Sequence, residues 1–329
     1  MKRFTMLKAL LCTLCLGIAI SCSDKRANTD VIEPISLNIG DVKVTNGVLL
    51  FSNQQEFENT VRLLTNKGSQ SLNDWELNFK GFVSMRTVYD QITEQDMTKI
   101  GGSKSLQGFE NYVMLLEANG EKQAVRVISS DAMATLFNKD GLVIIGDDAY
   151  KYKFDKVLKV SKPTESDMSS LATFDCKSLR STVNEIALIR QVNGKIISVK
   201  NGRAEGVKDD YCLVQYNGNR RLVGESNVTR NIGGSIFNSV TCQAKHQRRL
   251  FGIWWGEAIP RIRLRITSLL SSINTGNNIV ANPSEAYGLN TKGASLDIPE
   301  CPCYGTILYT ADGDTSDGYK ECSESESAF

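Results

Sequence analysis

The stretch RIRLRIT, residues 261–267, alternates strictly between arginine and aliphatic side chains until its final threonine. Successive residues of a β-strand point to opposite faces of the sheet, so Ile262, Leu264 and Ile266 share one face and the three arginines share the other. The pattern predicts a strand with one buried face and one solvated basic face. Binding of lipopolysaccharide or of an acidic partner is the alternative role for the arginines.

Further strands are predicted on the N-terminal side of this stretch, separated by glycine-containing turns. Asn193-Gly194 and residues 217–219 are hairpin signals because asparagine and glycine tolerate a positive φ. Short strands at this spacing predict a β-rich, sandwich-like unit over residues 181–310. The predicted strands of this unit cover residues 186–192, 195–199, 212–216, 235–244 and 259–266.

The preceding half of the chain shows a different pattern. A short apolar run at residues 48–51 is followed by Phe57, Val61 and Leu64 at helical spacing, and strands are predicted again from residue 112 onwards. The predicted fold class is therefore α+β, with an N-terminal mixed helix and strand unit followed by the β-rich unit. The predicted boundaries are an α+β domain at 46–162, a linker at 163–180 and a flexible acidic tail at 311–329.

Residues 1–21 have the features of a secretory signal peptide. Three basic residues precede an uncharged apolar run of twelve residues, whereas a helix that spans a bilayer needs about 20. The sequence Ala19-Ile20-Ser21-Cys22 resembles the lipobox of bacterial lipoproteins, with alanine where leucine is usual. This resemblance implies cleavage before Cys22 and lipid attachment to its thiol, with palmitate-type chains and a tether over residues 22–45.

Charge and residue counts exclude several classes of site. Removal of the leader takes three of the 38 basic residues, which leaves 35 basic against 37 acidic residues and gives no support to nucleic-acid binding. A single histidine excludes sites that need two imidazoles, and no phosphate-binding or dinucleotide fingerprint is present. We therefore predict no catalytic residue, no metal and no cofactor.

Six cysteines remain in the second half of the chain after the leader and Cys22 are set aside. An exported chain permits disulfides among them, and the spacing leaves the pairing open. The candidate disulfide cysteines are Cys176, Cys212, Cys242, Cys301, Cys303 and Cys322.

The segment KHQRRLFGIWWGE, residues 245–257, combines basic and aromatic side chains. Aromatic faces stack on sugar rings and cations, and arginine pairs with phosphate or carboxylate. The candidate ligand-binding residues are His246, Arg248, Trp254 and Trp255. The alternative is an ordinary strand in which one tryptophan packs inward and its neighbour covers the sheet edge.

The segment ADGDTSDG, residues 311–318, resembles a calcium loop only superficially. An EF-hand loop has glycine at its sixth position, where this chain has Asp317, and a glutamate at its twelfth position is lacking. An ordinary acidic loop is therefore predicted.

Three segments carry a resemblance to a family: NGVLLFSNQQEFENTV (46–61), DWELNFKGFVSM (74–85) and LFNKDGLVIIGDDAYKY (136–152). They resemble uncharacterised lipoproteins, a domain of unknown function from Bacteroides-type Gram-negative bacteria, and the resemblance is strongest over residues 46–160. It implies a cell-envelope location on the outer membrane and transfers no catalytic residue. Surface-displayed members carry an acidic run after the lipidated cysteine, whereas Lys25 and Arg26 follow Asp24 here, so the periplasmic and surface faces both stay open.

These observations predict a non-enzymatic, lipid-anchored envelope protein with a binding or structural role towards glycan or another envelope component. The first alternative is a carboxylate-dependent glycoside hydrolase or other envelope enzyme, which would show two carboxylates about 5–10 Å apart in a cleft. The second is a secretion-accessory or chaperone-like protein, which would show an exposed apolar groove. A flat surface would favour binding.

Overall fold

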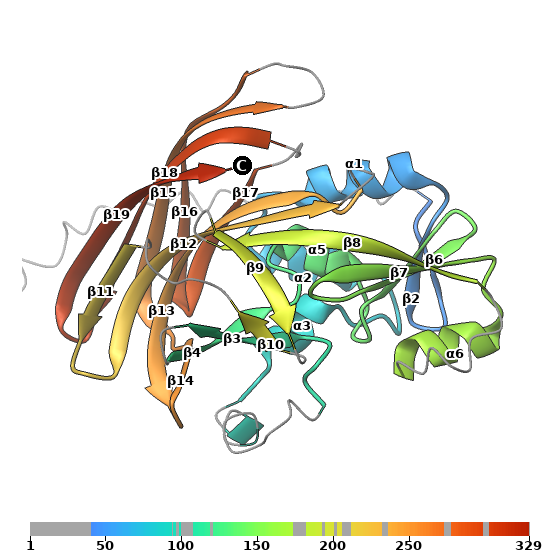
Figure 1. Cartoon of the computed structure of the whole chain (residues 1–329), viewed down its shortest axis with the longest axis horizontal. Helices are drawn as coiled ribbons and strands as arrows, with labels where there is room; N and C mark the ends of the chain where they lie inside the picture. The colour runs from blue at the N-terminus through green and yellow to red at the C-terminus, as the bar shows by residue number, and fades with distance from the viewer. Residues whose placement is uncertain are drawn as a thin grey trace, which may run out of the picture. The chain divides into compact units, whose positions relative to one another are not determined.

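The computed structural model describes residues 41–93, 95–96, 99, 108–118, 121–173, 182–192, 195–200, 203–205, 212–231, 236–272, 278–298 and 303–328. It is mostly β-structure and has an open sheet and a second sheet (Figure 1). The prediction of a β-rich fold is therefore confirmed. Within the described residues, no helix is long and apolar enough to cross a membrane.

The first half of the chain contributes strands to the large sheet and supplies the helices. Its strands are β1 (Lys43–Thr45), β2 (Val48–Phe51), β3 (Val113–Ala118), β4 (Glu121–Arg126), β5 (Leu142–Ile145), β6 (Asp148–Tyr152) and β7 (Lys156–Ser161). The helices are α1 (Gln54–Leu64), α2 (Ser69–Glu76), α3 (Met85–Asp90), α5 (Asp131–Leu136) and α6 (Glu165–Thr173).

Helix α1 shows how the sequence starts and orients these helices. The Asn53 side chain accepts a hydrogen bond from the backbone N–H of Glu56 at 2.9 Å, which satisfies one of the free amides of the first turn. Phe57 then points inward and makes edge-to-face contacts with Phe51 and Phe137 at centroid distances of 5.2 and 6.3 Å. The cap and the aromatic contacts together fix the helix against β2.

The large sheet combines strands from both halves. The second half adds β8 (Val183–Val192), β9 (Lys195–Lys200), β10 (Arg203–Glu205), β11 (Cys212–Tyr216), β12 (Arg220–Asn231), β13 (Ser239–Leu250), β14 (Ile253–Gly256) and β17 (Gly293–Ile298). Along the sheet, β7 is followed by β8, β9, β10, β3, β4, β14, β13, β12 and β11, while β17 pairs with β13 and β8 also pairs with β12. Residues 39–329 form one compact unit in which the predicted α+β and β-rich segments share strand pairings.

A second, four-stranded sheet contains the RIRLRIT stretch. Its order is β16 (Asn278–Thr291), β15 (Ile259–Ser272), β18 (Cys303–Thr315) and β19 (Gly318–Ala328), and Figure 1 shows these strands in orange to red. Ile262, Leu264 and Ile266 are buried as the alternation predicts. They join a core cluster with residues of β12, β13 and β17, so the two sheets pack face to face.

Two segments predicted to lack regular structure form it instead. The predicted linker at 163–180 contains helix α6, and the predicted flexible tail at 311–329 forms the end of β18 and all of β19. The predicted acidic loop is likewise strand at Asp312 and Asp314. The reason is that Tyr309 and Ala311 alternate with these acids and are buried in the core cluster, which holds β18 in the sheet.

The outer strands of the four-stranded sheet carry irregular or charged sequence. In β16, Ser284 pairs with Ile266 and Ala281 pairs with Ser268, so Asn282 and Pro283 together lie opposite Thr267 as a bulge. Among the described residues, β16 forms strand pairs only with β15, and β19 only with β18. These two strands are therefore the edges of the sheet.

Candidate functional site

The tryptophans of KHQRRLFGIWWGE lie inside the protein. Trp254 and Trp255 on β14 are only 1% and 6% exposed. The guanidinium of Arg221 lies 4.1 Å from the centroid of the Trp254 ring, and Trp255 packs against Tyr89 at 5.9 Å. The structure therefore corrects the expectation of an open stacking surface here, because neighbouring side chains cover both indoles.

His246 on β13 is buried and bonded on both ring nitrogens. The Glu257 carbonyl oxygen lies 2.8 Å from Nδ1, and because a carbonyl can only accept, Nδ1 carries the proton. Nε2 then accepts from the hydroxyl of Tyr216, and burial lowers the pKa of the imidazole. Arg248 pairs with the Glu257 carboxylate at 3.4 Å, so these two predicted ligand-binding residues hold β13 to the chain that follows β14.

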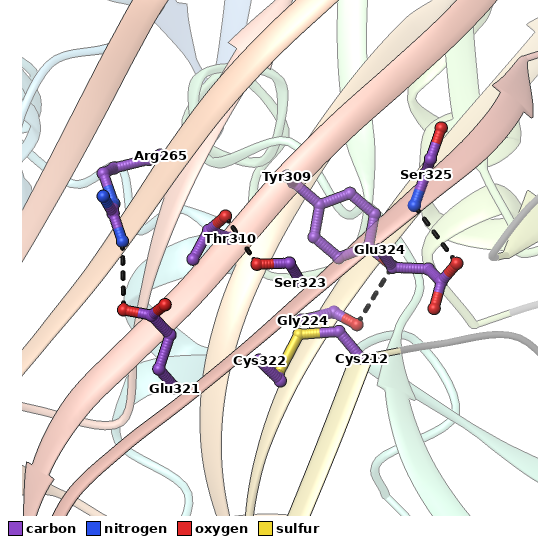
Figure 2. The surroundings of a disulfide bond; sticks show 10 residues. All are labelled: Cys212, Gly224, Arg265, Tyr309, Thr310, Glu321, Cys322, Ser323, Glu324 and Ser325. Atoms are coloured by element: carbon purple, nitrogen blue, oxygen red, sulfur yellow. Dashed lines mark hydrogen bonds and ion pairs between the residues drawn. A yellow bond between two sulfur atoms is a disulfide. The ribbon is translucent and has the colours of Figure 1, made fainter.

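Among the predicted cysteines that the structure describes, two form a disulfide and a third is buried in the core. Cys212 on β11 and Cys322 on β19 form a disulfide with a Cα–Cα distance of 5.2 Å and a sequence separation of 110 residues (Figure 2). Cys242 on β13 is buried in the core cluster, and the backbone of Cys303 begins β18. Three predicted cysteines lie outside the described residues: Cys22, Cys176 and Cys301.

The strands β12, β13 and β17 each bury two faces. Their apolar face meets the four-stranded sheet and includes Leu222, Val228, Val240, Cys242, Ala244, Ala294 and Leu296. Their opposite side, called the polar face below, consists of Arg221, Glu225, Asn227, Thr241, Gln243, Lys245, Gln247, Ser295 and Asp297. Alternation predicts such a row of polar residues, but a polar row on a strand normally faces solvent. The sequence alone therefore does not show that this row is buried.

Glu225 is the centre of the polar face. Its carboxylate pairs with the ammonium of Lys245 and accepts hydrogen bonds from Asn227 at 3.0 Å and from Gln123 at 3.1 Å. Burial favours protonation of Glu225, but Lys245 and these donors outweigh it and lower the pKa of the carboxyl. The glutamate therefore stays ionised and acts as the hub that links β12, β13 and β4.

Asp297 lies at the other end of the polar face, beside the start of α5. Its carboxylate accepts from the hydroxyls of Ser130 at 2.7 Å and Thr241 at 2.9 Å. Burial, together with the nearby charge of Asp131, raises the pKa of Asp297 to about 6. Asp131 itself pairs with Arg126, so this end of the face contains one readily ionised acid and one that resists ionisation.

The outward face of the four-stranded sheet carries the arginines of the RIRLRIT stretch. Arg261 pairs with Asp314 at 2.8 Å, Arg263 with Asp312 at 2.7 Å and Arg265 with Glu321 at 3.1 Å. Figure 2 shows the Arg265–Glu321 contact bridging from β15 to β19. The arginines that the sequence presented as a basic stripe are thus matched by acids on the neighbouring strands.

Two exposed tyrosines border this row of ion pairs. Tyr287 on β16 is 59% exposed and Tyr319 on β19 is 51% exposed. The Tyr287 hydroxyl donates to the Glu285 carboxylate, and the Tyr319 hydroxyl donates to the Glu321 carboxylate. Between the two tyrosines, the Asp312 carboxylate raises the pKa of Arg263. We call this surface the arginine–tyrosine face, which comprises Arg261, Arg263, Arg265, Glu285, Tyr287, Asp312, Asp314, Tyr319 and Glu321. It is an open surface that joins charged and aromatic side chains, and it is our candidate binding site.

Within the described part of the chain, no group of three histidine, cysteine or acidic residues is arranged to hold a metal ion. Comparison with known proteins adds little about identity. No family model matches the chain, and no curated protein matches it. Among solved structures, the chain is similar to a DUF4848 family protein from Bacteroides thetaiotaomicron, with 11% sequence identity, a TM-score of 0.28 and coverage of 86% of this chain and 99% of that chain.

Proposed function

We propose that the chain is an exported, lipid-anchored protein of the cell envelope, held on the outer membrane through Cys22, with a binding rather than a catalytic role. The observation that carries the proposal is the Cys212–Cys322 disulfide, which joins the two sheets. Structural disulfides persist in oxidising compartments such as the periplasm and are rare in the cytosol. The disulfide therefore agrees with the leader and lipobox-like sequence in supporting export.

A binding role is supported by the form of the candidate site. The arginine–tyrosine face is made by side chains that project from one side of a four-stranded sheet. A glycoside hydrolase needs one carboxylic acid that donates a proton and a second carboxylate across the scissile bond. Glu225 and Asp131 instead have basic partners in Lys245 and Arg126. Asp297, which resists ionisation, accepts hydrogen bonds from the hydroxyls of Ser130 and Thr241. These contacts suit a structural role.

The anchor is tested by metabolic labelling with a radioactive or alkyne-tagged fatty acid. The wild-type chain should incorporate the label, whereas Cys22→Ala should not, because the acceptor thiol is lost. Cys12→Ala, which changes a cysteine inside the leader, is the matched control and should label like the wild type. Equal labelling of the Cys22→Ala variant would exclude the anchor.

Export is tested separately by the state of the disulfide. Free thiols of the chain are alkylated in whole cells under denaturing conditions, before and after reduction, and counted by mass spectrometry. Cys212 and Cys322 should become reactive only after reduction. Alkylation of both without reductant would contradict an oxidising location.

A further inference from the structure

The register of the four-stranded sheet places the tyrosines on opposite sides of one arginine. Tyr287 lies directly across from Arg263, which lies across from Asp312 on the next strand. Tyr319 pairs with Asp314, one position along the same face. Three interstrand spacings of about 4.8 Å separate the outer strands, so the face is about 14 Å wide, wider than one sugar ring.

The two rings are exposed on this face, as is Leu289, which lies opposite Arg261 and is 75% exposed. The Tyr287 hydroxyl donates to Glu285 and the Tyr319 hydroxyl donates to Glu321, so each side chain is tied to an acid on its own strand. The Arg263 guanidinium also lies 6.0 Å from the centroid of the Tyr287 ring, within the range of a cation–π contact. The tyrosines are therefore held in position by the sheet while their rings stay accessible to solvent.

Asp312 beneath this surface has an unused hydrogen-bonding atom. It is 0% exposed although it points to the outer face, and its Oδ2 accepts from Arg263 Nε. Among the described residues, its Oδ1 and the Nε of Arg265 have no hydrogen-bond partner. A buried polar atom left without a partner costs free energy, and a ligand that supplies the partner recovers that cost.

The charges of the face limit the class of ligand. Each of the three arginines has a carboxylate partner on β18 or β19. Glu285 lies opposite Arg265 on the same side of the sheet, so four acids, Asp312, Asp314, Glu321 and Glu285, stand against three arginines and leave a net charge of −1. An anionic ligand would therefore have to displace an acid already in place. A neutral ligand that both donates and accepts hydrogen bonds meets no such opposition.

We propose that the arginine–tyrosine face binds a neutral carbohydrate, with sugar rings stacked on Tyr287 and Tyr319 and sugar hydroxyls bonded to Asp312 and Arg265. Both atoms are buried, so a sugar hydroxyl reaches them once the partly exposed Arg265 side chain turns aside. A hydroxyl is both a donor and an acceptor, so it can then donate to Asp312 Oδ1 and accept from Arg265 Nε. The width of the face fits an oligosaccharide. This inference rests on the proposed binding role and names its ligand class.

The test measures binding of the full-length chain, purified in detergent, to polysaccharides in non-denaturing affinity gels. The neutral probes are glucan, mannan and xylan, and the acidic probe is polygalacturonate. We expect retardation by at least one neutral polymer. Tyr287→Ala and Tyr319→Ala should each weaken it by about tenfold, because each removes one stacking ring.

Phe251→Ala is the matched control, since Phe251 is an exposed aromatic residue, 62% accessible, outside this face. It should bind like the wild type. Asp312→Asn tests the polar contact, and its thermal unfolding is recorded beside binding so that loss of fold is recognised. Tyr287→Phe and Tyr319→Phe keep the rings and serve as variants that should fold normally and retain most of the binding.

Three results would overturn the inference: retardation by no neutral polymer, retardation by polygalacturonate alone, or equal binding by wild type and both tyrosine-to-alanine variants. Failure here is distinguishable from failure of the proposed location. Fatty-acid labelling depends on Cys22 and not on the sheet face. If the protein binds a neutral polysaccharide but Cys22→Ala is labelled like the wild type, only the anchor is excluded.

Discussion

The apolar and polar faces of β12, β13 and β17 are both buried, but different forces hold them. On the apolar face, side chains such as Leu222 and Leu296 pack against the four-stranded sheet, and their contribution follows the area removed from water. On the polar face, Glu225 and Lys245 are stable only as a pair with their hydrogen-bond partners. The apolar face should therefore respond to changes of volume, and the polar face to changes of charge and pH.

The largest loss of stability is expected when a buried charge on the polar face loses its partner of opposite charge. Lys245→Met removes the cation beside Glu225 and should lower the free energy of unfolding by about 3–5 kcal/mol. Urea unfolding at pH 7 measures this loss. The double variant Lys245→Met with Glu225→Gln removes both charges and should recover most of the lost stability. If Lys245→Met alone is as stable as the wild type, the pair is not the hub of this face.

The next largest loss of stability is expected from removing the disulfide on the apolar side. Replacing Cys212 and Cys322 with alanine opens a loop with a sequence separation of 110 residues, which should cost about 2–4 kcal/mol. Chemical denaturation with and without dithiothreitol measures it. Reduced wild type should unfold like the double variant, and identical stability of oxidised and reduced wild type would mean that packing alone holds β19.

The substitution Asp297→Asn should change how stability depends on pH, which a change on the apolar face should not do. The pKa of Asp297 in the folded protein is about 6, above its ordinary value of 3.8. The folded state therefore favours the protonated carboxyl, and this contribution is present below about pH 4 and is lost as the pH rises through 6.

The asparagine variant has no charge to bury, so its advantage over wild type should grow from pH 4 to pH 8, reaching up to about 3 kcal/mol. Thermal unfolding across this range measures the difference. A variant of the apolar face, such as Leu222→Ala, is the control and should change stability equally at all these pH values. Parallel pH profiles of Asp297→Asn and wild type would contradict the assignment.

The smallest of these effects comes from adding one methyl group to the apolar side. A Cβ on Gly224 would lie 2.7 Å from Cε2 of Tyr309 and 2.9 Å from the sulfur of Cys212, so Gly224→Ala should destabilise by about 1–3 kcal/mol. Gly68→Ala, where nothing lies within 4 Å of the added atom, is the matched control. Equal unfolding midpoints for the two variants would show that the core around Tyr309 adapts freely.

Alternation and turn residues are local signals, and they were sufficient for part of the strands, whereas β12, β16 and β17 were not predicted. The predicted strands at 48–51 and 212–216 coincide with β2 and β11, and the face assignment of RIRLRIT is confirmed at Ile262 and Leu264. Pairing between distant strands was not predictable, since parallel partners such as β3 and β10 share no local pattern.

The buried polar residues and the C-terminal strand were missed for a common physical reason. Alternation separates a polar row from an apolar row but does not say whether another layer covers the polar one, as happens at Gln243 and Gln247. The serine- and glutamate-rich end was read as disordered because it lacks apolar residues. Cys322, an expected disulfide cysteine, was the signal within it that pointed to a fixed position.

The edge strands of the four-stranded sheet have a consequence for the protein at high concentration. An unpaired strand edge is a template on which a second chain can add a strand, which leads to aggregation. The bulge at Pro283 interrupts the register of β16, and proline has no backbone N–H to offer. In β19, Glu321 and Glu324 place negative charge along the other edge. Copies crowded side by side on a surface would thus repel or misalign at their edges, which keeps each tyrosine-bearing sheet separate and accessible.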